Sequence, residues 1–397
     1  MAKMVCPYCF SGTDPATLPY RCLMNTVGIA GSQPCAPVPD PRQAAALHRP
    51  GGIHSGPIFT AKARRGAVEC PDCRGHTTQR LCPECHRDLP ADYSGQGTKV
   101  IALVGPKSAG KSTYITVLVH ELRTRIGEQL GSALSPMDDA SSDRYDDMHR
   151  MMYVKDALPA TTRPAAVELT DPLLFRLGLP GRRGSRRRSR HVVLAFFDAA
   201  GEDLQTEAAT QRYARYLSAA DGILLLCDPL QLPVVRDLVG AAGGDLPPEE
   251  TAPDRIAAQS ARTLRAQRGL PTRKRISVPL AVALSKVDAL DAALPAGHRL
   301  SLHEPGPPVG EGIDPNDLAM VHDEVSALMT HWQQGALARQ LDTDFEDWRY
   351  FAVSALGDTP QGPGRAPAHG IHPLRVADPL LWLLARFGLV PVRRKVR

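Results

Sequence analysis

The stretch TKVIALVGPKSAGKSTYITVLVHEL, residues 98–122, decides the fold of the larger part of this 397-residue chain. It begins with an apolar run at 100–104, which predicts a short buried strand. Apolar residues then recur at helical spacing between Tyr114 and Leu122, which predicts an amphipathic helix. A strand, a glycine-rich loop and a helix in this order favour an α/β protein whose sheet is mostly parallel.

The loop between this strand and helix has the spacing G-x-x-x-x-G-K-S. Its glycines let backbone N–H groups approach an anion without Cβ clashes, and the helix N-terminus adds its dipole. Lys111 can reach the β and γ phosphates, and Ser112 offers its hydroxyl to Mg²⁺. A glycine turn before a helix, without a ligand, is the weaker alternative. The predicted nucleotide-binding residues are Gly105, Pro106, Lys107, Ser108, Ala109, Gly110, Lys111, Ser112 and Thr113.

A second apolar strand, in HVVLAFFDAAGEDL (191–204), ends at Asp198. In a mononucleotide-binding sheet, an aspartate at such a strand end lies near Mg²⁺, usually through water. Gly201, three residues later, lets a backbone N–H approach the γ phosphate. The alternative is a strand-to-helix turn with an aspartate cap.

The segment ALSKVDAL (283–290) follows the apolar run SVPLAV and ends a further strand. The Asp288 carboxylate can accept hydrogen bonds from guanine N1–H and the 2-amino group, while the stem of Lys286 packs along the base. Adenine offers neither donor, and two charge-assisted bonds imply discrimination of about 10²–10⁴. Ser285 can tie this loop to the phosphate loop. An ordinary strand end is the alternative.

A fourth short strand, in RYFAVSALGD (349–358), ends in Ser354, Ala355 and Leu356. A backbone N–H in this loop can meet guanine O6. The segment is the weakest of the four motifs, but it comes in the right order along the chain.

Eight of the nine cysteines lie before residue 86, and three pairs have the form C-P-x-C. Four thiolates from two such pairs make a closed tetrahedral zinc site. We predict one compact ribbon site at Cys70, Cys73, Cys82 and Cys85, and a second zinc site at Cys6, Cys9, Cys22 and Cys35. An interleaved arrangement, in which Cys6 and Cys9 join Cys82 and Cys85, stays open. Cys227 ends the apolar run DGILLLC, which predicts a buried core thiol.

The motifs GPKSAGKS, DAAG, SKVD and SAL, in this order over residues 98–390, resemble those of the TRAFAC class of P-loop GTPases. The resemblance implies a Ras-like fold, a mostly parallel sheet flanked by helices, that binds GTP with Mg²⁺. With its cysteine-rich N-terminus, the chain also resembles the bacterial double-GTPase type of this class, found widely in actinobacteria. That resemblance implies a nucleotide-state switch that works beside a second GTPase or accessory protein, in a conflict or signalling system.

The sequence departs from the Ras-like pattern at two points. Glu202 stands where glutamine orients the attacking water in Ras-like proteins. Its negative charge is repelled by the γ phosphate, so we expect slow hydrolysis without a partner. The switch threonine that completes Mg²⁺ coordination falls in LPATTRP, where Thr161 is favoured over Thr162. The catalytic candidates are Lys111, Thr161, Asp198, Gly201 and Glu202.

Composition predicts a two-part chain: a zinc-ribbon module at 1–95 and a GTPase domain with Pro/Gly-rich insertions at 96–397. The net charge of +5 is mild, no apolar run is long enough to span a membrane, and the N-terminus lacks a signal core, so we expect a cytoplasmic protein. The segments 167–177 and 191–198 flank an arginine-rich loop and predict an antiparallel hairpin at the sheet's edge.

Two rival hypotheses remain. In the first, the chain is an ATPase or base-tolerant NTPase, and SKVD is a strand end. In the second, the zinc ribbon binds nucleic acid and the P-loop domain is structural, although residues 1–95 have no concentrated basic face. We favour guanine nucleotide and a protein partner over nucleic acid.

Overall fold

The computed structural model describes residues 4–25, 33–47, 49–61, 66–90, 93, 98–106, 109–159, 171–180, 189–196, 207–243, 246–249, 251–290, 293–295, 307–362 and 364–393. The chain divides into two compact units, Met1–Thr98 and Lys99–Arg397. The helices described are too short or too polar to cross a membrane.

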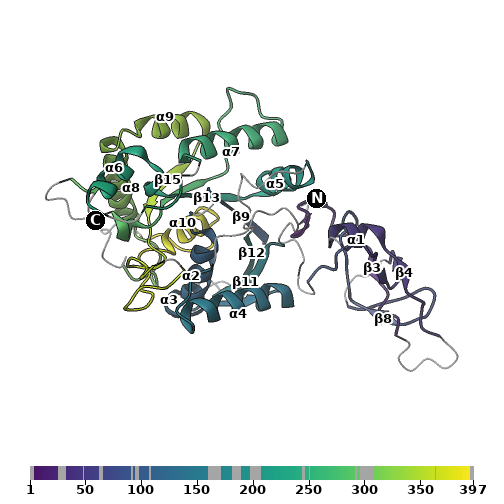
Figure 1. The fold of residues 1–397 in the computed structure, drawn as a ribbon. Helices are drawn as coiled ribbons and strands as arrows, with labels where there is room; N and C mark the ends of the chain where they lie inside the picture. The colour runs from purple at the N-terminus through teal and green to yellow at the C-terminus, as the bar shows by residue number, and fades with distance from the viewer. Residues whose placement is uncertain are drawn as a thin grey trace. The chain divides into compact units, whose positions relative to one another are not determined.

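The larger unit is built on a seven-stranded sheet in the order β10-β11-β12-β9-β13-β14-β15 (Figure 1). Its strands are β9 (Thr98–Val104), β10 (Ala133–Pro136), β11 (Leu173–Pro180), β12 (Ser189–Phe196), β13 (Gly222–Cys227), β14 (Leu280–Leu284) and β15 (Trp348–Ala352). Strands β9, β13, β14 and β15 pair in parallel, whereas β10, β11 and β12 pair antiparallel. The predicted α/β class with a mostly parallel sheet is confirmed.

The hairpin predicted between 167–177 and 191–198 is present as β11 and β12, but its predicted place at the sheet's edge is wrong. Strand β10 pairs with the outer side of β11, and β12 lies next to β9. Strand β10 is hard to predict from the sequence, because ALSP is only four residues long and ends in proline.

Helices cover both faces of this sheet (Figure 1). They are α2 (Lys111–Arg123), α3 (Arg125–Leu130), α4 (Asp139–Tyr153), α5 (Glu207–Ala219), α6 (Pro233–Ala241), α7 (Pro253–Arg268), α8 (Pro315–His331), α9 (Gly335–Asp344) and α10 (Asp378–Arg386). Two short 3₁₀ turns, η1 (Pro229–Gln231) and η2 (Val287–Ala289), follow β13 and β14. Helices α2, α4 and α10 contribute to one core with the sheet, and α7 contacts both α5 and α9 on the other face.

Strand β13 shows why these strands are continuously apolar. Leu224 and Leu226 belong to the core shared with α2 and α10, while Ile223 and Leu225 line a small cavity with Ala257 of α7. A strand buried on both faces requires apolar residues at successive positions. The carboxyl ends of β9, β13, β14 and β15 therefore emerge together from a fully covered sheet.

The described residues of the smaller unit form short hairpins and one helix. The strands pair as β1 (Met4–Val5) with β2 (Gly12–Thr13), β3 (Tyr20–Arg21) with β6 (Ile58–Phe59), β4 (Val38–Pro39) with β5 (His54–Ser55), and β7 (Val68–Glu69) with β8 (His76–Thr77). Helix α1 (Pro41–Ala46) begins after Asp40, whose carboxylate accepts a hydrogen bond from the Gln43 N–H at 3.0 Å. With so little regular structure, this unit depends on other interactions for its stability.

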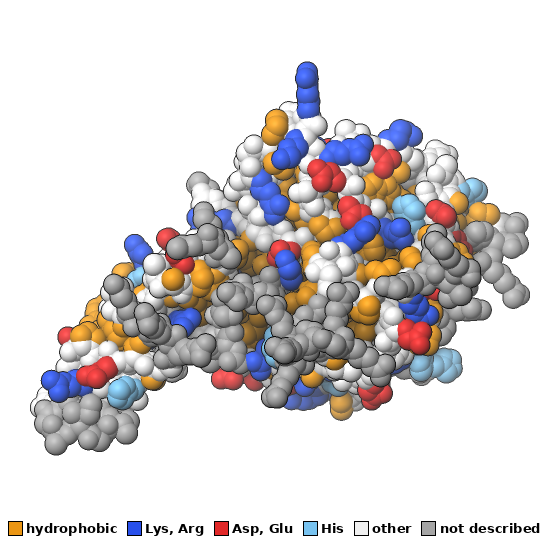
Figure 2. Space-filling view, turned by 180° about the vertical axis from the view of Figure 1, so that it is seen from behind, with side chains coloured by type: hydrophobic (Ala, Val, Ile, Leu, Met, Phe, Trp, Pro, Cys, Tyr) orange, Lys and Arg blue, Asp and Glu red, His pale blue; other side chains and the backbone are white. Residues whose placement is uncertain are grey.

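On the face of the molecule shown in Figure 2, Lys and Arg side chains lie among Asp and Glu side chains across the larger unit. A surface that mixes both signs of charge is typical of a solvated face.

Candidate functional sites

The glycine-rich loop at 105–110 joins the end of β9 to the start of α2, as the sequence predicts. Gly105 lies against β13, because a Cβ there would meet the Leu226 carbonyl oxygen at 3.1 Å. Gly110 has a φ of 80° at the N-cap of α2, a left-handed conformation that strains any residue with a side chain. Gly105 is therefore required by its close contact with β13, and Gly110 by its backbone conformation. Both lie in the loop that leads to the N-terminus of α2.

Lys111 is buried, and its ammonium group folds back onto this loop. Its Nζ donates to the Pro106 carbonyl at 2.7 Å and to the Gly105 carbonyl at 3.2 Å. Ser112 follows it in the first turn of α2. The arrangement keeps a positive charge beside the glycine-rich loop and the N-terminus of α2. A positive charge next to backbone N–H groups is what binds phosphate in proteins.

A partly buried ion pair joins the ends of β13 and β14. Asp228 directly follows β13 and is completely buried, and one of its oxygens accepts from Lys286 Nζ at 2.6 Å. Its other oxygen accepts from the Leu230 N–H at 3.0 Å. Lys286 has a left-handed backbone, with a φ of 54°, and the Ser285 N–H donates to the Cys227 carbonyl at 2.9 Å. These contacts fix the backbone that carries Asp288.

Asp288 and Ser354 lie together where β14 and β15 end. The Ser354 hydroxyl donates to the Asp288 carboxylate, but burial is the larger effect and raises the pKa of this aspartate. The Ser354 hydroxyl oxygen also accepts from the Gly357 N–H at 2.7 Å. Ala355 and Leu356 follow as half-buried residues. The structure thus brings the SKVD and SAL segments into one site at the carboxyl edge of the sheet.

Other predicted nucleotide-site residues lie outside the described residues. They are Lys107, Ser108, Thr161, Asp198, Gly201 and Glu202.

The cysteines form two groups of four. The first cluster is Cys6, Cys9, Cys82 and Cys85, and the second cluster is Cys22, Cys35, Cys70 and Cys73. Within each cluster all Sγ atoms lie within 4.8 Å of one another. The closest pairs are 3.7 Å apart in the first cluster and 3.5 Å apart in the second. A tetrahedral zinc site with Zn–S bonds of about 2.3 Å places its sulfurs about 3.8 Å apart, so both clusters fit a zinc ion.

The compact ribbon of Cys70, Cys73, Cys82 and Cys85 is therefore wrong, as is the set of Cys6, Cys9, Cys22 and Cys35. The interleaved alternative is confirmed. The reason lies between the two pairs, where the chain runs beside β3. The Arg21 N–H donates to the Gln79 carbonyl at 2.9 Å, and the Leu81 N–H donates to the Pro19 carbonyl at 3.1 Å. This pairing separates the turn of Cys82 and Cys85 from the turn of Cys70 and Cys73.

The three C-P-x-C turns share one backbone geometry. The N–H of the fourth residue after the first cysteine, namely Phe10, Arg74 or His86, donates to that cysteine's carbonyl at 2.9–3.0 Å. These three residues have φ values of 59°, 58° and 53°. A tight, repeated turn of this kind aims both thiols of a pair at one point, as a metal knuckle requires.

Backbone N–H groups also donate to sulfur in the second cluster. The Met24 N–H lies 3.3 Å from Cys22 Sγ, and the Gly75 N–H lies 3.4 Å from Cys73 Sγ. The Gly75 contact lowers the pKa of Cys73 to about 7. Such donors favour the thiolate, which is the form that binds metal. By contrast, Cys227 is buried in the core of the larger unit, as predicted, and burial raises its pKa.

Arg21 connects the surroundings of the two clusters. It is buried, donates to Asp88 at 2.7 Å and to the His86 carbonyl at 2.6 Å, and forms an ion pair with Asp40 at 3.4 Å. Asp40 in turn lies 2.8 Å from His86 Nδ1. Arg21 directly precedes a cysteine of the second cluster, and His86 directly follows one of the first. One charged network therefore supports both clusters.

Asp228 and Arg21 are not among the residues predicted from the sequence. The signal for Asp228 was its position directly after the apolar run of β13, at the carboxyl end of a buried strand. Arg21 gave no comparable signal, because a lone arginine beside a cysteine is common and its partners are far along the chain.

Comparisons with known proteins bear on both units. Residues 99–351 match the family model described as Double-GTPase 2. A protein of Mycolicibacterium smegmatis with the name "Putative ESX-1 scaffolding and assembly protein SaeC" is 28% identical over 422 residues, which cover 97% of this chain and 99% of that protein. The structure of the small GTPase Arl6 (BBS3) of Trypanosoma brucei, with bound GppNp, is 14% identical with a TM-score of 0.27, over 73% of this chain and 98% of that one.

Proposed function

Because the chain belongs to the Double-GTPase 2 family, we propose that it is a GTP-binding regulatory switch that hydrolyses GTP slowly with Mg²⁺. One observation carries this proposal: the phosphate loop and the Asp288–Ser354 site follow strands of the same parallel group, β9, β14 and β15. Ligands of open α/β sheets bind at the carboxyl ends of such strands.

In this proposal, different residues bind different parts of the nucleotide. The backbone of 105–110 and Lys111 hold the phosphates, and Ser112 holds Mg²⁺, which neutralises charge on the β and γ phosphates when bound. Asp288 accepts from the guanine edge, with Ser285 and Lys286 supporting the base and residues 354–356 facing guanine O6. Thr161, Asp198 and Gly201 complete the γ-phosphate side.

The Asp228–Lys286 pair supports guanine recognition indirectly. Asp228 loses all of its solvation on folding and Lys286 loses part of it, and their mutual attraction offsets that loss. The 2.6 Å contact therefore favours a single position for the lysine stem. A fixed stem beside the base reduces the ordering that binding requires.

We further propose that zinc occupies both cysteine clusters and that the smaller unit recognises a protein partner. Each cluster supplies four thiolates and leaves no ligand position open for substrate, which is typical of structural zinc. The relative's name refers to scaffolding and assembly, which favours a protein partner over nucleic acid. The nucleotide state of the larger unit would then regulate that interaction.

Phosphate release from GTP tests the enzymatic part of the proposal. The wild-type protein should hydrolyse GTP slowly and only with Mg²⁺, and Lys111→Ala should abolish the activity. Glu202→Gln should hydrolyse faster, because the amide removes a negative charge beside the γ phosphate. Hydrolysis that survives Lys111→Ala, or that proceeds equally in Mg²⁺ and in chelator, would refute the assignment.

A further inference from the structure

The loop that follows β15 closes on itself and is attached to two other parts of the larger unit. Its two ends pair with each other: Ser354 and Leu374 exchange both backbone hydrogen bonds, at 3.0 and 2.9 Å, and the His372 N–H donates to the Leu356 carbonyl at 2.9 Å. Gly357 must be glycine at this closure, because its φ is 81° and a Cβ would collide with the His372 carbonyl. The loop therefore starts and returns at Ser354, beside Asp288.

The middle of this loop pairs with the segment that follows α4. The Leu158 N–H donates to the Gly364 carbonyl, and the Ala366 N–H donates to the Asp156 carbonyl, both at 2.9 Å. Ala157 and Arg365 face each other between these bonds as an antiparallel bridge. Ala366 and Pro367 are buried, although Arg365 before them and Ala368 after them are exposed. Residues 364–366 and 156–158 thus form a short, specific two-stranded contact.

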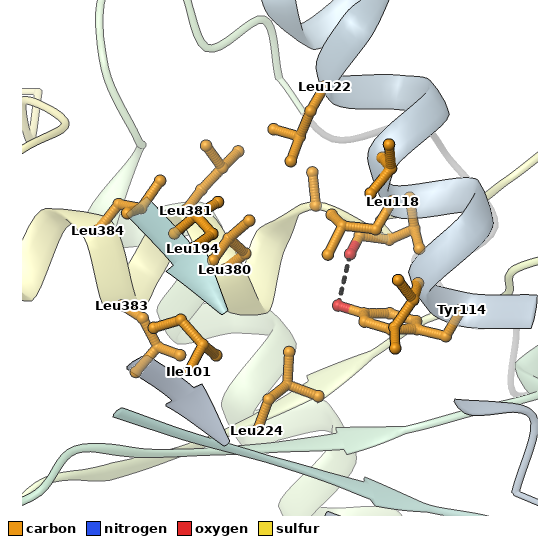
Figure 3. Packing of buried hydrophobic residues seen from close by; sticks show 14 of the residues in the cluster. Ile101, Tyr114, Leu118, Leu122, Leu194, Leu224, Leu380, Leu381, Leu383 and Leu384 are labelled. Carbon is orange, nitrogen blue, oxygen red and sulfur yellow. Dashed lines mark hydrogen bonds between the residues drawn. The ribbon is translucent and has the colours of Figure 1, made fainter. Parts of the chain in front are cut away.

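The returning end of the loop is also tied to the helix of the phosphate loop. The buried Tyr114 hydroxyl of α2 donates to the Val376 carbonyl at 2.8 Å (Figure 3). Val376 lies two residues beyond Leu374. One continuous segment, 354–376, therefore contacts the Asp288 side chain at one end and α2 at the other.

We propose that residues 364–366 and 156–158 form a strap that holds the base-binding side of the nucleotide site closed and sets how fast the nucleotide leaves. This inference rests on the proposed function, since it assumes that guanine lies at Asp288 and Ser354. Release requires loops around a bound nucleotide to separate. The strap opposes that separation because it anchors the loop of Ser354 to the end of α4.

Two proline variants break the strap from opposite sides. Leu158→Pro and Ala366→Pro each remove one N–H donor. Both residues precede a proline, so their backbone already favours an extended conformation and tolerates the new ring. The matched control is Ala368→Pro, an exposed position in the same loop outside the pairing. A third variant, with residues 359–371 replaced by Gly-Ser-Gly, removes the strap while leaving Ser354 and Leu374 in place.

The measurement is the dissociation rate of a fluorescent GDP from the full-length protein, chased with unlabelled GDP in Mg²⁺. Each proline variant should release it about 2- to 10-fold faster, as the loss of one backbone hydrogen bond implies, and the shortened loop faster still. Ala368→Pro should match the wild type. The melting temperature without nucleotide should fall by no more than a few degrees in each proline variant, as the loss of one hydrogen bond implies, while the faster release separates this role from a structural one.

The outcomes distinguish the two proposals. If the wild type does not bind fluorescent GDP, the proposed function fails. If the wild type binds it and all strap variants release it at the wild-type rate, the proposed function stands and the strap is overturned. A uniform fall in melting temperature with unchanged release would also overturn the strap and leave these contacts as packing.

Discussion

Asp288 is the side chain on which the proposed recognition of guanine depends. Its carboxylate accepts from Ser354, it lies two residues beyond the Lys286–Asp228 ion pair, and burial raises its pKa. This half-buried carboxylate loses part of its solvation on folding, at a cost in free energy. A ligand that brings two N–H donors would repay that cost.

The raised pKa of Asp288 predicts a pH-dependent preference for guanine. Only the ionised carboxylate accepts both hydrogen bonds from guanine, so GTP affinity should fall as the pH drops through the folded pKa. That fall should begin above the usual aspartate value of about 3.9, while ATP affinity lacks it. Competition between GTP and ATP, titrated downward from pH 7.5, measures the ratio. Asp288→Asn is the control, and a ratio that changes equally in both proteins would contradict the prediction.

For single residues, the sequence predicts those side-chain positions that depend only on nearby residues. The positions of Lys111 and Ser112 follow from the motif, because the loop's glycines and the helix start fix where those side chains emerge. Asp228 could not be predicted in the same way, since its partner Lys286 is 58 positions away and only the sheet brings them together. The residues outside the described ranges, among them Asp198 and Glu202, stay predictions.

Among the elements, the repeated cysteine turns and the hairpins between them organise the smaller unit. The spacing C-P-x-C was sufficient to predict knuckles, because two thiols from one tight turn converge locally. Which knuckles join in one cluster was not predictable, because the pairing depends on the contact of residues 79–81 with β3. In the larger unit, α2 follows from its apolar spacing, whereas β10 exists only through its pairing with β11.

The network around Arg21 predicts that an arginine-specific geometry holds this unit together. Arg21→Lys keeps the charge but cannot donate to Asp88, Asp40 and the His86 carbonyl at once. Breaking a buried pair costs about 3–5 kcal/mol, which is a large share of the stability of so small a unit. We expect the variant to retain less than two zinc ions per chain by elemental analysis.

Arg42→Lys is a suitable control for this experiment, because Arg42 is exposed and donates to a single carbonyl, that of Pro83. Zinc content in Arg21→Lys equal to that of wild type and control, with an unchanged protease cleavage pattern, would show that the network is dispensable.

The whole molecule consists of two units, and the proposed zinc sites would give the smaller one a different source of stability. The larger unit has an extended apolar core on both faces of its sheet. The smaller unit has two-residue strands, and apparent zinc-binding energies of about 10–16 kcal/mol per site are of the size of a domain's entire stability. Folding of the two units should therefore respond separately to metal removal.

This difference predicts a selective effect of chelation. A strong zinc chelator should make residues 1–95 sensitive to protease while residues 96–397 stay resistant, and a chain of residues 96–397 alone should bind GTP like the full protein. Limited proteolysis with mass spectrometry reads the first outcome, and titration calorimetry the second. Resistance of the N-terminal unit after complete zinc removal would contradict the metal-dependent account.

The central claim is that the larger unit recognises guanine through Asp288 while the glycine loop and Lys111 hold the phosphates. Calorimetric titration of the full-length protein with GTP and with ATP, both in Mg²⁺, tests it most directly. GTP should bind about 10²–10⁴-fold more tightly, and Asp288→Asn should remove most of that difference. Equal affinity for the two nucleotides, or a guanine preference that survives Asp288→Asn, would contradict the claim.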